Sequence, residues 1–156
     1  MNDEPLEALE PWIDGFLARL KPGERLRLSR KIGQLLRRVN AARIRRNVEP
    51  DGSAMEPRKV RRDSQGRLRG RRGKGRMFRK LGLARNMKVK ARPDEVEVSF
   101  NSRVSRTAAV HHFGLKDRVE KRRNSIRVRY AERRLLGIPK GDKQAIMDEV
   151  LQHLER

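Results

Sequence analysis

Three histidines and one pair of glutamates are the side chains in this sequence most suited to catalysis or metal binding. His111 and His112 are adjacent, so on a helix they would point about 100° apart and could not share a metal ion. His153 has no second histidine near it in the sequence, and Glu95 and Glu97 alternate with apolar residues, as on the exposed side of a strand. We therefore interpret all five as structural or solvating residues, and we predict no catalytic residue, no metal site and no cofactor.

The motifs that mark common enzyme classes are also missing. The sequence contains no GxSxG, HExxH, Walker or GxGxxG motif. It contains no cysteine, which excludes disulfides and thiolate metal sites. No apolar run approaches the ~20 residues that span a bilayer, and the acidic first residues do not resemble a signal peptide. We predict a protein that is not an enzyme and that does not contact a membrane.

Positive charge is concentrated in the middle of the sequence. The chain has a net charge of +21, and residues 58–92 contain 16 Lys and Arg against one acid. Charge at this density opposes compact folding and favours polyanions or acidic protein surfaces. We expect residues 50–92 to be a basic arm, of which the part from Arg58 to about Arg92 becomes ordered only on assembly. Its candidate contacts with a partner or with DNA are Arg58, Arg61, Arg62, Arg67, Arg69, Arg71, Arg72, Lys74, Arg76 and Arg79.

The residues of the arm leave two destinations open. Clustered cations bind backbone phosphates through counterion release, which is compatible with DNA. The arm holds one aromatic residue, Phe78, so stacking on unpaired bases is poorly supported. A stripe of Met77, Phe78, Leu81 and Leu83 in its far half favours a protein surface instead.

Helices are predicted at both ends of the chain. Apolar residues recur at helical spacing over residues 6–20 and 24–46, with a break at Lys21-Pro22-Gly23. A last helix over residues 142–154 can be capped by Asp142. The predicted buried stripe of the second helix consists of Leu28, Ile32, Leu35, Val39 and Ala42, widened by Leu36.

Shorter elements are predicted between the arm and the last helix. Residues 96–100 and 126–130 alternate apolar and polar side chains, as strands do. Residues 104–113 indicate a strand end or a short helix, and residues 77–85 a short helix. The predicted fold class is α+β in one domain, with an N-terminal helical pair (1–49), the basic arm or hairpin (50–92) and a strand–helix–strand–helix part (93–156). We expect the helices to pack on one small antiparallel sheet containing both predicted strands.

Several short motifs follow one another in a recognisable order. The run from His111 to Leu115 is followed by an arginine-rich strand with Tyr130, by residues 133–137 (RRLLG) and by the closing helix. Earlier come LEALEPWIDGFLARL, PDGSAMEPRK and RGRRGKGRMFRKLGLAR. Through these motifs nearly the whole chain resembles the tail completion, or virion morphogenesis, family of contractile-tailed temperate phages. The motif residues that the resemblance singles out are His111, Phe113, Gly114, Tyr130, Arg133, Leu136 and Gly137.

This resemblance implies a structural protein that completes the head-proximal end of the tail and enables head–tail joining. It implies a virion location after assembly in the host cytoplasm, and a homo-oligomeric ring that six-fold tail symmetry would make a hexamer. The implied partners are tail-tube or terminator proteins and neck proteins, and packaged DNA in the lumen is one of the two destinations left open for the arm. We also expect Gly114 to end a short helix and Phe113 to be buried there. The alternative that the composition leaves open is a basic nucleic-acid-binding protein.

Overall fold

The structure is a computed structural model that describes residues 14–15, 17–58, 65, 77–119 and 125–155. In chain order these residues form α2 (Pro22–Arg46), the 3₁₀ helix η1 (Ala84–Asn86), β1 (Met87–Ala91), β2 (Val96–Phe100), α3 (Ser102–His112), β3 (Lys116–Arg118), β4 (Arg127–Arg129) and α4 (Lys140–Leu154). The chain is α+β, as the sequence predicted. Most of the helix predicted over residues 6–20 lies outside the described residues. No helix in the described part is both long and apolar enough to cross a membrane.

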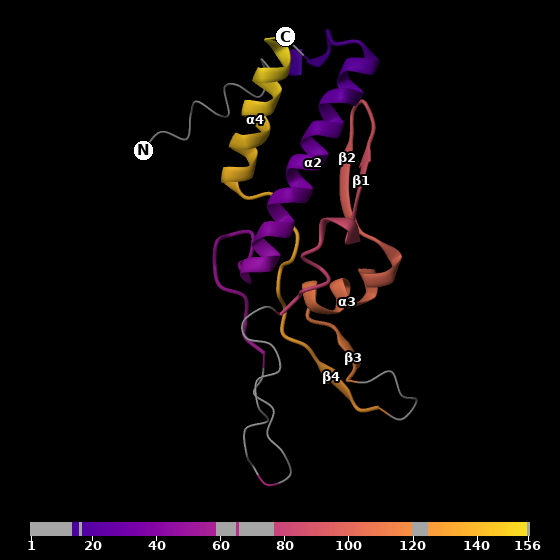
Figure 1. Cartoon of the computed structure of the whole chain (residues 1–156), viewed down its shortest axis with the longest axis vertical. Helices are drawn as coiled ribbons and strands as arrows, with labels where there is room; N and C mark the ends of the chain where they lie inside the picture. Colours follow the sequence, from indigo (N-terminus) through magenta and orange to yellow (C-terminus); the bar gives the residue numbers. More distant parts are fainter. Residues whose placement is uncertain (1–13, 16, 59–64, 66–76, 120–124, 156) are drawn as a thin grey trace.

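Helix α2 is the central element of the molecule. Figure 1 shows it along the long axis, with α4 beside it on one side and the β1–β2 hairpin on the other. The helix begins at Pro22, which suits the first helical position, and Glu24 accepts a hydrogen bond from the Lys21 N–H at 3.4 Å. It ends at Asn47, whose left-handed backbone (φ 56°) lets the chain turn away.

The buried face of α2 is wider than the predicted stripe. Leu35, Val39 and Ala42 are only partly buried, because α2 is covered from two sides and its buried residues spread around the helix. At Gly33 the β1 strand comes so close that a Cβ would collide with Val89. The buried residues of α2 are Leu28, Ser29, Gly33, Leu36, Asn40, Ala41 and Ile44.

The two predicted strands do not share a sheet, which corrects the sequence prediction. β2 pairs antiparallel with β1, with Val89 opposite Val98, and β4 pairs antiparallel with β3. β1 was missed because its apolar positions stand between lysines and were counted as part of the arm. The short connection of residues 92–95 brings β1 and β2 together at little entropic cost, whereas residues 126–130 are separated from β2 by a helix.

The far half of the predicted arm belongs to the core, which is a second correction. Phe78, Leu81 and Met87 are buried, and Met77 packs against them. Residues 77–83 form turns before η1 rather than the predicted short helix. The main core cluster contains Ala41, Ile44, Met55, Phe78, Leu81, Met87, Val104, Ala108 and Leu135. Met77, Phe78, Leu81 and Met87 therefore pack within the chain's own core.

A second apolar cluster joins α4 to α2. Leu28 and Val150 are its buried centre, and Leu17 and Leu20, which precede α2, pack against it. Ile32, Ile146, Met147 and Leu154 complete this cluster. Asp142, predicted as a helix cap, lies inside α4, whose N-cap is Pro139.

Candidate partner-binding surface

Motif residue Arg133 is a buried side chain that contacts motif residue His111. It is only 5% exposed and lies between the end of α3 and residues 55–58. Its Nε donates to the Glu56 carbonyl oxygen at 2.6 Å, and its Nη2 donates to the Pro57 carbonyl oxygen at 3.1 Å. Arg133 thus fixes the backbone just before the basic segment, which we define as residues 59–76.

His111 and His112 take part in this arrangement as neutral hydrogen-bond acceptors. The His111 ring lies edge-on between Phe78 and Tyr130, with centroids 4.9 Å from each, and its Nδ1 is 3.4 Å from Arg133 Nη1. Burial, with the nearby Arg133 charge, lowers the pKa of His111. His112 Nδ1 accepts the Leu135 N–H at 3.1 Å, and burial also lowers its pKa. Both histidines make contacts within the chain, and their purely structural role stays a prediction.

The two residues that flank the basic segment, Arg58 and Met77, meet at the end of α2. Arg58 donates to the carbonyl oxygen of Met77, and the Met77 N–H donates to Asn47 Oδ1 at 3.2 Å. Arg58 and Arg79 are the predicted contact residues that the structure describes, and both are exposed. The other predicted contacts lie outside the described residues: Arg61, Arg62, Arg67, Arg69, Arg71, Arg72, Lys74 and Arg76.

At the end of α3, the prediction for Gly114 is confirmed and the prediction for Phe113 is wrong. Gly114 has the expected positive φ, of 60°, directly after the helix. Phe113, expected to be buried, is 63% exposed. It occupies the C-cap, where the chain turns away from the core, and its ring contacts His112 at a centroid distance of 4.6 Å. An exposed phenylalanine is available for contact with another molecule.

Sequence reasoning missed a buried polar cluster that ties α2 to the RRLLG segment and α4. Asn40 Oδ1 accepts the Gly137 N–H at 3.1 Å and a bond from Arg43 at 2.9 Å. Arg43 also donates to the Gly137 carbonyl oxygen at 2.9 Å and lies 2.8 Å from the Asp142 carboxylate. The signal that could have found it is the i, i+3 pair of Asn and Arg on the apolar side of α2. Motif residue Leu136 packs against the core, and its neighbour Leu135 is fully buried.

The β3–β4 hairpin presents two chemically different faces. Opposed residues share a face, and faces alternate along each strand. Val119 pairs with Ile126 through a hydrogen bond of 3.0 Å, and Asp117 pairs with Val128. One face therefore carries the exposed apolar residues Leu115, Val119, Ile126 and Val128. The other carries the exposed cations Lys116, Arg118, Arg127 and Arg129.

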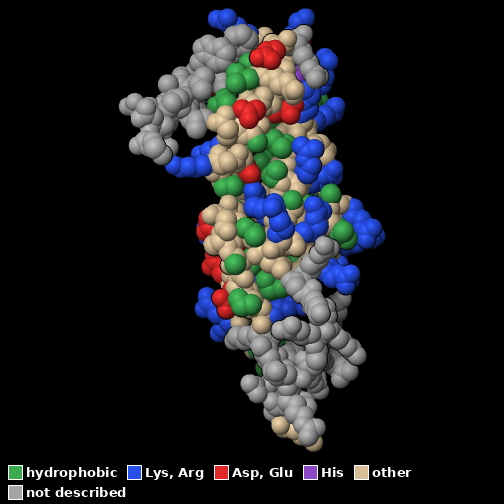
Figure 2. All heavy atoms as spheres, turned by 60° about the vertical axis from the view of Figure 1, so that its left-hand side comes forward, with side chains coloured by type: hydrophobic (Ala, Val, Ile, Leu, Met, Phe, Trp, Pro, Cys, Tyr) green, Lys and Arg blue, Asp and Glu red, His purple; other side chains and the backbone are tan. Residues whose placement is uncertain are grey.

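Positive charge also covers the outside of α2. Figure 2 shows Lys and Arg side chains spread along the face that carries α4 and α2, with acidic side chains grouped in a few places. The exposed arginines of α2 are Arg27, Arg30, Arg38, Arg45 and Arg46. Within the described residues, no group of three or more His, Cys, Asp or Glu side chains is placed to hold a metal ion. The chemistry that this surface offers is therefore binding of anionic and apolar groups.

The comparisons with known proteins agree with the resemblance seen in the sequence. Residues 5–155 match the phage virion morphogenesis family, and the chain belongs to that family. It is 32% identical over 159 residues to tail completion protein S of Escherichia phage P2, and the alignment covers 100% of both chains. No solved structure matches the chain significantly.

Proposed function

We propose that this protein is a structural component of a phage tail and acts in tail completion rather than as an enzyme. The observation that carries the proposal is its full-length similarity to a tail completion protein. The described polar clusters support it, because Arg133 and Arg43 bond to backbone and neighbouring elements and hold segments in place. Its place would be the head-proximal end of the tail, where it would prepare the tail for joining to a DNA-filled head.

We further propose that the protein acts as a ring subunit, with a hexamer matching a six-fold tail. Closed cyclic rings are a common form of homo-oligomer, and association can stabilise a chain with a limited core. The exposed apolar residues of the β3–β4 hairpin and Phe113 are surfaces that such contacts would cover. Tail-tube or terminator proteins and neck proteins would be the neighbours of the ring.

The basic segment would contact packaged DNA. Residues 59–76 contain nine Lys and Arg, one acid and two aliphatic residues, Val60 and Leu68. Three of the four residues of the apolar stripe that favoured a protein partner, Met77, Phe78 and Leu81, are occupied in the core, so the remaining chemistry is mainly that of phosphate binding. In a ring, these segments would supply the cations that meet DNA in the lumen.

Electron microscopy of lysates tests the tail-completion role directly. A phage or prophage carrying a nonsense mutation in this gene should give filled heads beside separate tails, or tails of abnormal length. Normal joined virions would contradict the proposal. A plasmid copy of the gene should restore joined virions, which excludes effects on neighbouring genes.

Replacing cations in the basic segment tests its role separately. The variant with Arg69, Arg71, Arg72 and Lys74 changed to serine should form the same assembly as the native protein but fail to restore joined virions. A matched control changes Arg27, Arg30, Arg38 and Arg46 on α2 to serine and should restore them. Loss of the assembly itself in the first variant would show that the segment packs between subunits and would overturn the DNA contact.

A further inference from the structure

The β3–β4 hairpin exposes apolar side chains that a binding partner would cover. An isolated two-stranded hairpin is at best marginally stable in water unless one face is covered. Ile126 is 76% exposed, and the only ion pair to this hairpin in the described part of the chain joins Arg106 to Asp117 near its base, at 2.7 Å. Toward the tip, the apolar face of Val119, Ile126 and Val128 has no cover among the described residues.

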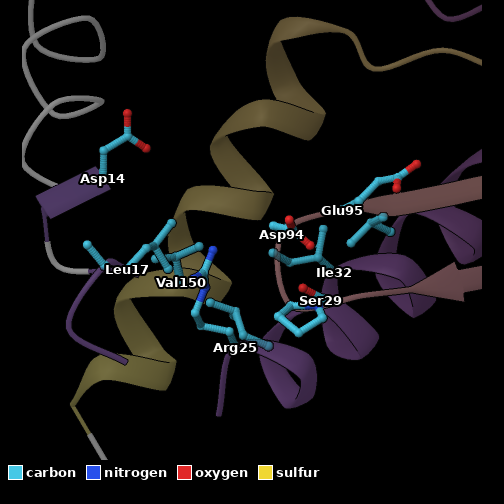
Figure 3. A pocket seen from close by; sticks show the side chains of 12 residues that line it. Asp14, Leu17, Arg25, Ser29, Ile32, Asp94, Glu95 and Val150 are labelled. Carbon is cyan, nitrogen blue, oxygen red and sulfur yellow. The ribbon is translucent and has the colours of Figure 1, made fainter. Parts of the chain in front are cut away.

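An apolar groove with acidic groups at its edge lies at the other end of the molecule. It has a volume of about 490 Å³ and runs between α2, α4, residues 14–18 and the β1–β2 turn. Figure 3 shows Asp94 and Glu95 on the turn side of the groove and Asp14 on the opposite side, with Arg25 between. The apolar lining consists of Leu17, Ala18, Leu28, Ile32, Pro93, Val96 and Val150.

The carboxylates at this groove are partly available to a ligand. Glu95 is paired with Arg92 at 3.0 Å, but Asp14 and Asp94 have no ion-pair partner among the residues that the structure describes. Three acids and one arginine line a groove in a chain whose net charge is +21. The groove is therefore a locally acidic site on a basic protein, suited to an apolar segment flanked by cations.

We propose that the β3–β4 hairpin of one copy of this chain docks in the acidic groove of a second copy. The hairpin carries both chemistries on its two faces, since Ile126 and Val128 lie on the apolar face and Arg127 and Arg129 on the opposite one. With the apolar face in the groove, the long arginine side chains can extend around the strand to the carboxylates at the groove's edge. It lies far from the groove of its own chain, because the β1–β2 turn that lines this groove and the β3–β4 hairpin lie toward opposite ends of the long axis in Figure 1. This inference rests on the proposed ring, and it names the two surfaces that would form it.

Charge distinguishes this groove from the other large one. The second groove, of about 500 Å³, lies between α2, β2 and α3 and has no acidic or basic side chain other than His112 in its lining. It could cover apolar residues, but it offers no carboxylate to the hairpin cations. A contact between two different surfaces is heterologous, and repeating it generates a ring when the rotation closes.

Cysteine cross-linking tests the contact, because the chain has no native cysteine. The full-length protein carrying both Ile126→Cys and Asp94→Cys, freed of nucleic acid, should form a covalent ladder on mild oxidation that ends at the ring size. Each single variant should give no ladder. A dimer from Ile126→Cys alone would show hairpin–hairpin contact, and a ladder from Ile126→Cys with Ile138→Cys would place the hairpin in the second groove. Either result would overturn the proposal.

Mixing two defective variants provides an independent test. Ile126→Glu should weaken self-association by at least about tenfold, as should Asp94→Lys, since each damages one of the two surfaces. Mixed together, they should form a heterodimer and nothing larger, because only one intact pair of surfaces remains. The matched control Ile138→Glu replaces another exposed isoleucine and should assemble normally. Circular dichroism of every variant excludes unfolding as the cause.

The tests of the hairpin–groove contact can fail without affecting the test of the tail-completion role, and the reverse also holds. If the native protein stays monomeric in sedimentation, or if the mixed variants gain no association, the hairpin–groove contact is wrong. The nonsense-mutant lysate still reports on tail completion in that case. Normal virions in that lysate, together with a cross-linked ladder, would instead leave the contact intact and remove the proposed function.

Discussion

Gly114 turns the chain out of α3 toward β3 in a conformation that other residues rarely adopt. Its φ is 60°, and a Cβ added there would lie 3.1 Å from the Glu132 backbone nitrogen and 3.2 Å from the Tyr130 carbonyl oxygen. Both the backbone angle and the neighbouring chain therefore require glycine.

We expect Gly114→Ala to lower the free energy of unfolding by about 1 kcal/mol or more, through the left-handed backbone and the crowding at Glu132. Urea unfolding followed by circular dichroism measures this. Gly23→Ala is the matched control, because its Cβ would enter open space in the first turn of α2, and it should cost nothing. Equal stability of the two variants would refute the argument for Gly114.

The two histidines make stability depend on pH. The folded-state pKa values of His111 and His112 lie below the ordinary value, so the unfolded chain binds more protons as the pH falls through that range. Protonation of His112 Nδ1 would also remove the acceptor for the Leu135 N–H. Stability contributed by the neutral rings is complete above about pH 6.5 and is lost as the pH falls below it.

We therefore expect the native protein to lose unfolding free energy between pH 7.5 and pH 5.5. The loss should be smaller in the double variant His111→Gln, His112→Gln. Guanidinium unfolding at both pH values gives the comparison. A double variant with the same pH dependence as the native protein would show that other groups cause the loss.

At the scale of elements, α2 is held to α4 by one buried and one exposed ion pair. Arg43 and Asp142 lie 2.8 Å apart with side chains only 11% exposed, whereas Lys31 and Glu149 are 3.3 Å apart with side chains 36% and 26% exposed. Breaking a buried pair leaves a charge without its partner, but an exposed pair is replaced by water.

Asp142→Ala should consequently destabilise the protein by about 3 kcal/mol. Glu149→Ala, the matched control on the same helix, should cost less than about 1 kcal/mol. Chemical unfolding of both variants under the same buffer measures the difference. Similar losses in the two would mean that Asn40 and Gly137 hold Arg43 well enough without the carboxylate.

Helices and turns could be predicted where the residues that determine them are neighbours in the sequence. Features that depend on a contact with another part of the chain could not. The 25-residue α2 could be predicted from its period and from Pro22, and the turn at Gly114 from the glycine itself. β1 could not be recognised, because its alternating lysines have the composition of the basic arm. It becomes a strand only through its hydrogen bonds to β2. The role of Arg133 could not be foreseen either, since its acceptors at residues 56 and 57 lie far away in the sequence.

At the scale of the whole molecule, the net charge of +21 favours non-specific binding of polyanions such as nucleic acids to this protein. The exposed arginines of α2 and the cations of β3 and β4 add to those of the basic segment. Phosphate binding of this kind depends on counterion release and weakens steeply with salt.

We expect the purified protein to retain nucleic acid at low ionic strength and to release it by ~0.5 M salt. Absorbance at 260 and 280 nm during elution from an immobilised-heparin column follows the release. Nucleic acid that stays bound above that salt and is removed only by nuclease would favour the alternative, a dedicated nucleic-acid-binding protein.

The hydrogen bond between Arg58 and Met77 joins the two residues that flank the basic segment. Because residues 58 and 77 already touch, the loop between them can lengthen or shorten with little effect on folding, at about 0.6 kcal/mol for each doubling. Insertions, deletions and charge changes can accumulate there while Arg133 and the core stay constrained. Relatives are therefore expected to differ most in length at this position.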